Sequence, residues 1–337
     1  MTRRYHTKDF LNPRLFVGAT LSTLLVACGG GSSGSGNDAT TAISEADNHA
    51  VDTSRFMEDA VVSIETVSCT LSDGSASSCY EITLNGFPAD RSSLGPFCPE
   101  TTSTGANDAG TWFEDGVLYD LTGAFVADLA NFYNDDNWQL FNAQTGDVYI
   151  TNTQAACEAA AQPNVPANYN NYCVQCDISY YSDEPLKGIA VTYLIPATPQ
   201  PRDAPGAIDR GGVGAAFNGV KLDAAAPTDA ILGAYTIAAF DECVGHINPH
   251  AGYHYHGANH GDGDCPAIDF ETDGHGGAFG YALDGYAIYA MADSAGNEST
   301  DLDSCRGHSD ETRGYHYHTA SAGENAFIGC FTGETAR

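Results

Sequence analysis

The sequence contains a duplicated block of histidines and tyrosines, residue types that can bind metal ions and exchange protons. Residues 241–256 align without gaps on residues 303–318, and nine of the sixteen positions are identical in the pattern D-x-C-x-G-H-x5-G-Y-H-Y-H. We call these blocks the first and second cassettes. Side chains two residues apart share one face of a strand, so both histidines of each Y-H-Y-H segment point the same way, and an earlier histidine completes an H-x7-H-x-H triad. The six predicted metal ligands are His246, His254 and His256 in the first cassette and His308, His316 and His318 in the second.

Three imidazoles that leave a fourth coordination position open are typical of Zn(II) or Cu(II) sites. The alternative is that these side chains only pair across strands or hydrogen-bond within a polar core. Nine of the eleven histidines lie between residues 246 and 318, and this concentration favours metal binding. Outside the triads, His250, His260 and His275 belong to the first copy alone, where they either enlarge that site, support its ligands or lie at the surface.

A weaker pattern, for calcium, follows the first cassette. Asp269, Glu271, Asp273 and Gly274 resemble the first half of a calcium-binding loop, but Gly280 stands where a bidentate glutamate is expected. The sequence therefore favours an acidic surface loop here, with calcium binding as the minor alternative.

The sequence alone assigns no catalytic residues. If the triads serve an enzyme, Asp284, Tyr255 and Tyr317 are the candidate acid–base groups. Asp284 either orients a histidine ligand or closes a turn before Gly285, and the second role is at least as well supported. The sequence has no phosphate-binding loop, dinucleotide fingerprint or Ser/His/Asp order, so no organic cofactor is predicted.

The charge balance of the chain restricts its partners. Among 337 residues there are 13 Lys and Arg against 44 Asp and Glu, a formal net charge of -31. Binding to nucleic acid or to anionic lipid through charge requires clustered basic residues, so neither is expected as an electrostatic partner. The hydrophobic fraction of 42% is enough for a large buried core, which argues against a disordered chain.

The N-terminus has the features of a bacterial export signal. Residues 1–27 contain four basic residues and an apolar stretch, 15–27, that is too short to span a bilayer. The segment Leu25-Val26-Ala27-Cys28 resembles the lipobox of bacterial lipoproteins, which implies cleavage before Cys28 and attachment of lipid to its thiol. Residues 28–52 are then a flexible Gly/Ser-rich tether. We expect an exported protein anchored to the cell envelope, with the membrane as its partner through the lipid. Gly29 resembles the residue that follows the cysteine in outer-membrane lipoproteins of Gram-negative bacteria.

The cysteine count agrees with export. Besides Cys28 the chain has ten cysteines, an even number that predicts five disulfides in an oxidising compartment. Pairing between the two cassettes is the alternative to pairing within each of them. The expected pairs are Cys69 with Cys79 across a hairpin, Cys243 with Cys265, and Cys305 with Cys330.

Short apolar or alternating runs between turn residues predict a mainly β fold with few short helices. We expect a single disulfide-rich β domain over residues 53–337, in which residues 98–180 are a cysteine-containing elaboration. Helices are predicted near residues 125–133 and 153–161, and the three-proline stretch 196–201 is expected to be an extended loop. The predicted strands cover residues 61–67, 80–84, 117–121, 147–150, 189–195, 231–239 and 281–291.

These segments together resemble the YHYH-domain family. The resemblance rests on the two cassettes, on Gly280–Tyr289 with its Ala-Leu-Asp-Gly motif, and on short matches at residues 85–88, 217–220 and 328–331. Residues 98–180 do not match the family pattern. The family has no established activity, so the resemblance implies a type of domain and leaves its chemistry open.

Three functions are consistent with the sequence. The favoured one is an exported, lipid-anchored protein that binds Cu or Zn through both triads. The second is a metal-dependent hydrolase or oxidoreductase, in which the bound ion activates water or handles oxygen. The third is a structural or adhesive surface domain in which disulfides and Tyr/His ladders only stabilise the fold.

Overall fold

The computed structural model of the chain describes residues 49–162, 164–259, 265 and 270–337. The predicted signal peptide at 1–27, Cys28 and nearly all of the predicted tether at 28–52 lie outside the described residues. Within the described ranges, no helix has the length and apolar character needed to cross a membrane.

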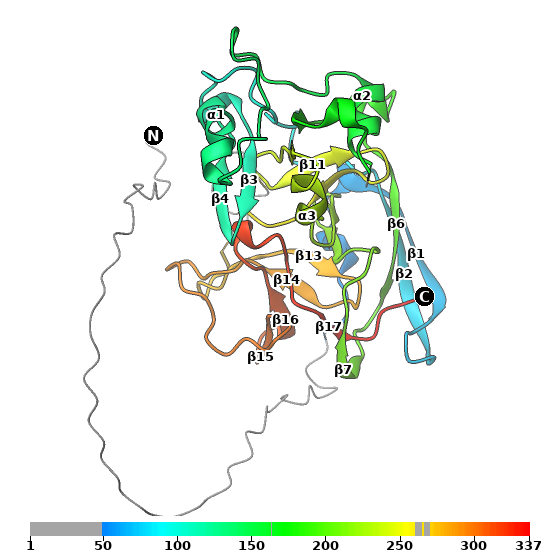
Figure 1. Ribbon diagram of the computed structural model, residues 1–337. Coiled ribbons are helices and arrows are strands. Elements are labelled where there is room, and N and C mark those ends of the chain that lie inside the picture. The colour runs from blue at the N-terminus through cyan, green and yellow to red at the C-terminus, as the bar shows by residue number, and fades with distance from the viewer. Residues whose placement is uncertain (1–48, 163, 260–264, 266–269) are drawn as a thin grey trace, which may run out of the picture. The chain divides into compact units, whose positions relative to one another are not determined.

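An eight-stranded sheet carries both cassettes (Figure 1). Each cassette folds into an antiparallel hairpin, and the two hairpins, β11–β12 and β15–β16, form the opposite ends of this sheet. The antiparallel pair β8–β13 lies at its centre. The strands, in their order across the sheet, are β11 (Gly245–Asn248), β12 (Gly252–Tyr255), β9 (Lys221–Leu222), β8 (Gly214–Ala216), β13 (Ala278–Ala282), β14 (Ala287–Tyr289), β16 (Gly314–His318) and β15 (Gly307–Asp310).

The two halves of this sheet repeat one another strand for strand. Leu222 in β9 pairs with Gly214 in β8 and, in parallel, with Tyr255 in β12. In the second half, Ile288 makes the same two pairings. It pairs with Gly280, which is 66 positions after Gly214, and, in parallel, with Tyr317. The duplicated unit is therefore four strands, larger than the cassette that the sequence alignment detects. The two units meet in two-fold fashion, because β8 and β13 are equivalent strands that pair antiparallel.

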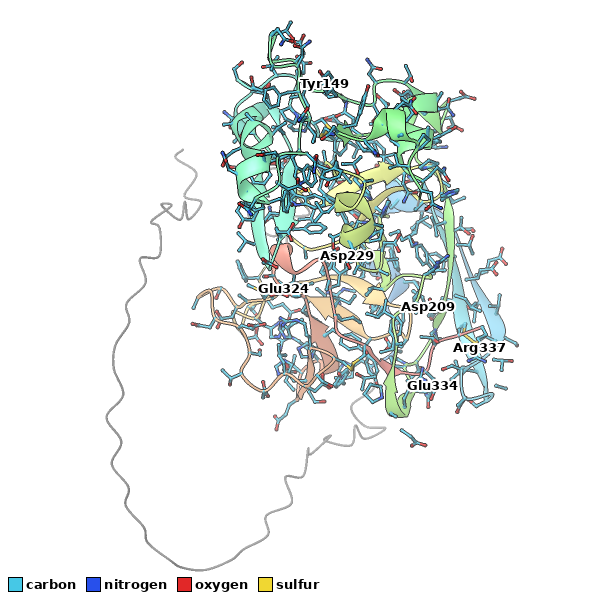
Figure 2. All side chains as sticks on the ribbon, viewed as in Figure 1. Tyr149, Asp209, Asp229, Glu324, Glu334 and Arg337 are labelled. Carbon is cyan, nitrogen blue, oxygen red and sulfur yellow. A yellow bond between two sulfur atoms is a disulfide. The ribbon has the colours of Figure 1, made fainter. Side chains whose placement is uncertain are left out.

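Smaller sheets surround the large one. In β2, Ile82 and Leu84 are buried while Glu81 is exposed, the alternation expected when one face of a strand covers a core. The C-terminal residue Arg337, labelled in Figure 2, donates its amide proton to the carbonyl of Thr70 in the neighbouring strand (2.9 Å). The strands of these sheets are β1 (Val61–Thr70), β2 (Ala76–Leu84) and β6 (Val191–Pro196); β7 (Pro201–Gly206) with β17 (Phe331–Gly333); β5 (Tyr172–Val174) with β10 (Thr236–Ala238); and β3 (Thr111–Glu114) with β4 (Val117–Asp120).

Helices are few and short, and two of them lie in the 98–180 elaboration. Each of these two begins at a threonine whose hydroxyl accepts a backbone N–H of the first turn, as an N-cap does: Thr122 from Phe125 (3.1 Å) and Thr153 from Ala156 (3.2 Å). The α-helices are α1 (Gly123–Phe132), α2 (Gln154–Ala160) and α3 (Thr228–Leu232). Single-turn 3-10 helices occur at Thr53–Arg55, Glu58–Ala60, Ala106–Asp108, Ala167–Tyr169, Ile178–Tyr180 and Ala322–Glu324.

The mainly β prediction is confirmed, and both predicted helices are present within a few residues of their expected bounds. Three predicted strands are wrong. Residues 281–291 form two strands, β13 and β14, because Asp284 and Gly285 close a turn in which Gly285 has a φ of 89°. Residues 231–239 contain the end of α3, a turn and β10. Residues 147–150 make only isolated bridges and form no strand. In the three-proline stretch, Pro201 is the first residue of β7, a position where a strand tolerates proline.

Five disulfides stabilise the fold, as the cysteine count predicts, and all three expected pairs are present. The other two lie within the 98–180 elaboration, where they join Cys98 to β5 and α2 to the segment that follows β5. The elaboration has a core of its own, in which Trp112, Phe113 and Leu129 are buried together with Phe240. Because Phe240 comes just before the first cassette, this packing holds the elaboration against that cassette. The five bonds are Cys69–Cys79, Cys98–Cys173, Cys157–Cys176, Cys243–Cys265 and Cys305–Cys330.

Candidate functional site

An aspartate at the start of each cassette builds the turn that leads into its hairpin. Asp241 Oδ1 accepts the backbone N–H groups of Cys243 (3.0 Å) and Gly245 (3.1 Å). Between them Val244 adopts a left-handed conformation with a φ of 58°, which the contacts to the aspartate stabilise. Asp303 accepts the equivalent pair of N–H groups in the second cassette at 2.8 and 3.0 Å. The D-x-C-x-G part of the repeated pattern is therefore a turn that fixes the position of the first histidine of each triad.

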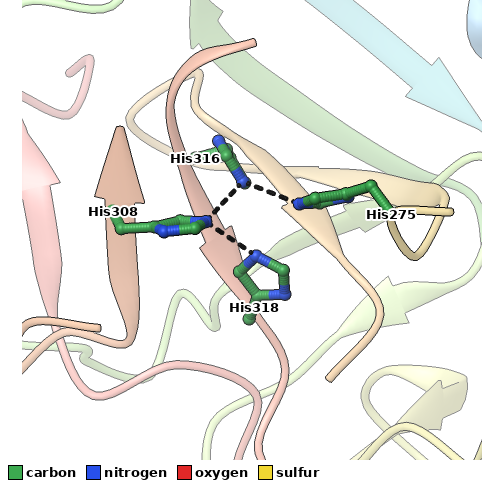
Figure 3. A group of neighbouring side chains, drawn as sticks. All are labelled: His275, His308, His316 and His318. Atoms are coloured by element: carbon green, nitrogen blue, oxygen red, sulfur yellow. Dashed lines mark hydrogen bonds between the residues drawn. The ribbon is translucent and has the colours of Figure 1, made fainter. Parts of the chain in front are cut away.

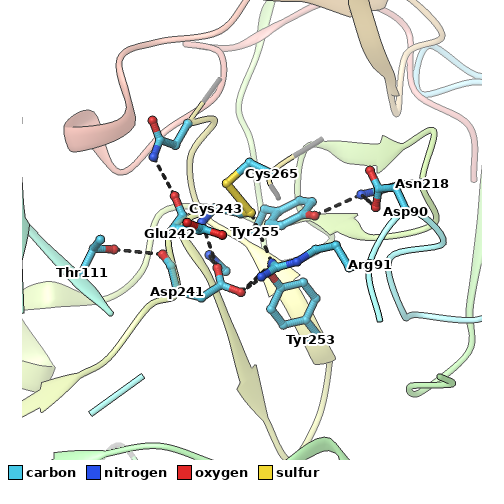
Figure 4. The surroundings of a disulfide bond; sticks show 12 residues. Asp90, Arg91, Thr111, Asn218, Asp241, Glu242, Cys243, Tyr253, Tyr255 and Cys265 are labelled. Atoms are coloured by element: carbon cyan, nitrogen blue, oxygen red, sulfur yellow. Dashed lines mark hydrogen bonds and ion pairs between the residues drawn. A yellow bond between two sulfur atoms is a disulfide. The ribbon is translucent and has the colours of Figure 1, made fainter. Parts of the chain in front are cut away.

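The tyrosines of each Y-H-Y-H segment are buried on the strand face opposite the histidines. Tyr253 donates its hydroxyl proton to Asp241 Oδ2 (2.7 Å), and Arg91 pairs with the same oxygen at 2.8 Å (Figure 4). Tyr315 donates to Asp303 in the same way at 2.7 Å. The tyrosines therefore connect the turn of each cassette to the strand that carries the histidines.

The candidate acid–base groups belong to this buried framework. Tyr317 donates to Asp284 Oδ2 (2.6 Å), and Tyr255 accepts a hydrogen bond from Asn218 Nδ2 (3.0 Å). Asp284 also accepts the N–H of Gly333 (2.9 Å), and its carboxylate hydrogen-bonds to no histidine in the described part of the chain. Burial raises the pKa of Asp284, and it raises that of Tyr317 well above 10. Asp284 therefore stabilises the turn before Gly285 and accepts a hydrogen bond from Tyr317. Closing this turn is the second of the two roles that the sequence allows for Asp284.

The three histidines of the first cassette converge on one point, which we call the first cage. His246 on β11 lies directly opposite His254 on β12, and His256 follows β12 by one residue. The Nε2 atoms of His246 and His254 are 3.0 Å apart, and those of His246 and His256 are 3.2 Å apart. The antiparallel register of the hairpin, together with the period of two along the strand, produces this convergence.

Backbone carbonyls determine which ring nitrogens face the centre of the first cage. His254 Nδ1 lies 3.0 Å from the carbonyl oxygen of Gly252, and His256 Nδ1 lies 2.6 Å from that of Ala224. A carbonyl oxygen only accepts, so both Nδ1 atoms carry the proton and both Nε2 atoms present a lone pair to the centre. Burial lowers the pKa of both rings, that of His256 to about 3, so both are neutral near pH 7.

The second cage contains four histidines (Figure 3). His308 on β15 lies opposite His316 on β16, His318 ends that strand, and His275 comes from the segment before β13. The Nε2 atom of His308 is 3.0 Å from that of His316 and 3.1 Å from that of His318. The Nε2 atoms of His316 and His275 are 3.2 Å apart. Burial lowers the pKa of His316 to about 3 and that of His318 to about 4.

Every Nδ1 atom of the second cage faces an oxygen, so all four rings turn Nε2 towards the centre. The carbonyl that orients His318 belongs to Ala290, which is 66 positions after the Ala224 that orients His256. The orientation of the last histidine is therefore part of the duplication. The four contacts are His308 to Asp301 Oδ1 (2.9 Å), His316 to Gly314 O (3.0 Å), His318 to Ala290 O (2.7 Å) and His275 to Gly276 O (2.7 Å).

The facing Nε2 atoms of the second cage are placed as the ligands of a cation would be. Two lone pairs at 3.0–3.2 Å do not form a hydrogen bond, and a single added proton can bridge only one such contact. Nitrogens about 2.05 Å from a tetrahedral ion are about 3.3 Å from one another, close to the separations in both cages. An oxygen on Nδ1 with Nε2 free is also the usual arrangement of a metal-binding histidine. Across the described residues, these two cages are the groups of His, Cys, Asp or Glu that could hold a metal ion.

The structure brings together all six histidines that the sequence predicts as ligands, three in each cage. It corrects the position of His275, which the sequence assigns to the first copy but which lies in the second cage. No spacing marks this residue, because only the pairing of β13 with β14, and of β14 with β16, brings it beside the second hairpin. His250 is exposed on the turn of the first hairpin, and His260 lies outside the described residues.

The acidic loop with the calcium-like pattern is tied to the second cassette by an arginine. Arg313, in the second hairpin, pairs with Glu271 (2.9 Å), with Asp273 and with Asp310. Asp269, the first residue of that pattern, lies outside the described residues. These ion pairs hold the loop that carries His275 against the cage.

The first cage adjoins a cavity of about 600 Å³, and its three histidines form part of the cavity wall. Asp223 Oδ2 lies 3.9 Å from His254 Nε2 and 3.0 Å from the ammonium group of Lys221. Asn248 Nδ2 makes a longer contact of 3.4 Å with the same His254 nitrogen. The first cage is therefore bordered by a carboxylate, an amide and open space, where the second cage has a fourth imidazole.

Comparison with known proteins identifies the domain. Residues 192–301 match the model of the family described as YHYH protein. The match includes all four strands of the first repeat, the first cage and His275, and it ends just before the second cassette. Neither the curated proteins nor the solved structures contain a match to the chain.

Proposed function

We propose that this chain, a YHYH-domain protein, binds one transition-metal ion, Zn(II) or Cu(II), in each histidine cage. The observation that carries the proposal is the convergence of imidazole Nε2 atoms at 3.0–3.2 Å, in rings that all, except His246, direct Nδ1 to an oxygen. In the second cage all four Nδ1 atoms face oxygens, so the facing Nε2 lone pairs cannot form the hydrogen bonds that would join the rings of a purely structural cluster.

The donor set favours these two metals. Neutral imidazole nitrogens suit Zn(II) and Cu(II), whereas calcium and magnesium require oxygen ligands. Soft thiolate ligands are absent from the cages, since the cassette cysteines Cys243 and Cys305 are both in disulfides. The six predicted histidines and His275 are thus the proposed ligands.

We further propose that the protein works in the cell envelope, exported and anchored by lipid on Cys28, with the outer membrane as the expected site. The lipobox-like segment before Cys28 supports this, and so do five disulfides, which persist in oxidising compartments. Expression with labelled palmitate in a Gram-negative host tests it. Label should enter the wild-type protein and be lost in Cys28→Ser, and equal labelling of both would refute the anchor.

Metal analysis of the protein without residues 1–27 tests the central proposal. The wild-type protein should retain two equivalents of Zn or Cu. His254→Gln/His256→Gln and His316→Gln/His318→Gln should each retain one. His250→Gln is the matched control, because this exposed histidine lies outside both cages, and it should retain two.

Thermal unfolding gives an independent measurement. A metal at 100 times its Kd stabilises the folded state by about 2.7 kcal/mol at each site, which raises Tm by about 5 °C or more. A chelator should reverse this shift. A folded wild-type protein that takes up no metal at micromolar concentrations, and whose Tm does not respond to a chelator, would refute metal binding and favour a structural domain.

A further inference from the structure

We infer that the two cages have different roles: the second is a closed four-nitrogen site, whereas the first leaves a coordination position open to a chamber that receives a small organic carboxylate. This inference rests on the proposed metal binding and adds to it a ligand for one of the two ions. It follows from the differences between two units that share the same strand pairing.

In the part of the chain that the structure describes, the fourth ligand of the second cage has no counterpart in the first. The offset of 66 positions that relates β13 to β8, counted back from His275, leads to Asp209 (Figure 2). The Asp209 carboxylate accepts the N–H of Gly211 (2.7 Å) and is not part of the first cage. Among the described residues, the first cage therefore supplies three protein nitrogens, the number of protein ligands in zinc sites that bind a water or a substrate.

The space in front of the first cage is a chamber, lined mostly by residues between 210 and 256 and in part by the elaboration between residues 98 and 180. Its volume of about 600 Å³ lies in the usual range for small-molecule sites. Ala160 at the end of α2 and Val174 in β5 contribute to one wall, and Ala230 in α3 contributes to another. These small apolar side chains leave room for an apolar body and offer it no hydrogen bonds. The disulfide Cys157–Cys176 joins α2 to the segment after β5 and so holds this wall together.

Charge identifies the head group that the chamber prefers. Arg210 lines the chamber, is exposed, and forms no ion pair with any residue that the structure describes. The carboxylate of Asp223, also on the wall, is balanced by Lys221 at 3.0 Å. A divalent ion in the cage therefore makes the chamber positive within a chain of formal charge -31. A carboxylate can fill the open position on the ion and pair with Arg210 while its apolar part faces the alanines.

The second cage excludes such a ligand. His275 occupies the fourth position there, and the loop that carries it is held by the ion pairs of Arg313 with Glu271, Asp273 and Asp310. Tyr289 packs on the ring of His316 with centroids 4.8 Å apart. The register of the repeat places Asp223 where the second copy has Tyr289, so a bulky ring in one copy corresponds to a small polar residue in the other.

Cobalt spectroscopy of proteins with a single intact cage tests the inference. His316→Gln/His318→Gln leaves only the first cage, and His254→Gln/His256→Gln leaves only the second. Each protein is loaded with Co(II), the metal content is measured, and sodium benzoate is titrated while the visible d–d bands are recorded. We expect a saturable spectral change for the first cage and none for the second.

Three variants locate the ligand. In the protein with the first cage only, Arg210→Gln should raise the Kd of benzoate about tenfold by removing a charge-assisted hydrogen bond. Ala230→Trp should weaken binding at least as much by filling the chamber. In the protein with the second cage only, His275→Ala should create a response to benzoate where there was none.

The outcomes separate this inference from the proposal on which it rests. No spectral change at a first cage that holds one equivalent of cobalt would overturn the inference and leave metal binding intact. An equal response from a second cage with His275 present would also overturn it. An unchanged Kd in Arg210→Gln would refute recognition of the carboxylate in the chamber. Failure of the first cage to hold cobalt at all would instead contradict the proposed function.

Discussion

A buried ion pair beneath the first cassette allows a quantitative test of how the cage is supported. The side chains of Arg91 and Asp241 are 3% and 0% exposed, and Arg91 Nη1 lies 2.8 Å from Asp241 Oδ2. The same guanidinium nitrogen is 3.0 Å from the hydroxyl of Tyr253. Arg91→Met removes the positive charge and keeps an unbranched apolar chain, so Asp241 becomes a buried carboxylate without its counter-ion.

Comparison with the second cassette helps to estimate how much unfolding free energy Arg91→Met should lose. Asp303 has no arginine partner among the described residues, but it is exposed, so water can solvate its charge. Asp241 keeps three donors after the substitution, the N–H groups of Cys243 and Gly245 and the hydroxyl of Tyr253, but it has no access to water. Breaking a buried pair from one side costs about 3–5 kcal/mol of unfolding free energy, and the three remaining donors place our expectation near the lower value.

Urea unfolding with the disulfides intact measures this loss, with the fluorescence of the buried Trp112 and Trp138 as the signal. The control is Lys187→Met, which breaks an ion pair to Glu184 whose side chains are 51% and 68% exposed and which should change stability by less than about 1 kcal/mol. Arg91→Met/Asp241→Asn should recover part of the loss, because it removes the stranded charge. If Arg91→Met destabilises no more than Lys187→Met, the buried pair does not support the cassette as we argue. If the double variant recovers nothing, the loss comes from packing and not from charge.

Two further predictions follow from the cages and their tyrosines. In Gly307→Ala the new methyl group would overlap the hydroxyl of Tyr315, so we expect a loss of about 1–3 kcal/mol in urea unfolding and a weaker second cage; wild-type stability and two retained metal ions would contradict this. The metal-free protein should lose stability as the pH falls from about 6.5, because the unfolded chain then binds protons that buried His256 and His318, with pKa values of about 3 and 4, do not accept. Tm measured between pH 7 and pH 4 checks the second prediction, and a Tm that is constant over this range in the metal-free protein would contradict it.

The sequence predicts the parts of the site that depend on local geometry. The period of two along a strand is enough to place His254 beside His256 on one face, and the cysteine pairs of the cassettes follow from their proximity in the chain. The two helices of the elaboration are recognisable because threonines such as Thr153 cap their first turns. These features depend only on residues that are close together in the sequence.

Other parts of the site depend on long-range pairing and are not visible in the sequence. His275 is 41 residues from His316, and its place in the second cage depends on the order of strands in the large sheet. The chamber depends on the packing of α2, β5 and α3 around the first hairpin, which no spacing encodes. The split of residues 281–291 into two strands was within reach of turn chemistry, since Asp284 and Gly285 are typical turn residues between apolar runs.

The symmetry of the large sheet explains how one duplication can give two different histidine cages. Because β8 and β13 pair at the centre, the two hairpins are at opposite ends of the sheet, and each cage has different neighbours. The first is bordered by a chamber to which the elaboration between residues 98 and 180 contributes, and the second by the loop that brings His275. Three shared nitrogens set which metals can bind, and the unshared neighbour sets whether the fourth position is open. A fourth neutral imidazole adds a ligand without adding charge, so the second ion should be held more tightly, and dialysis against a weak chelator should remove the first ion before the second.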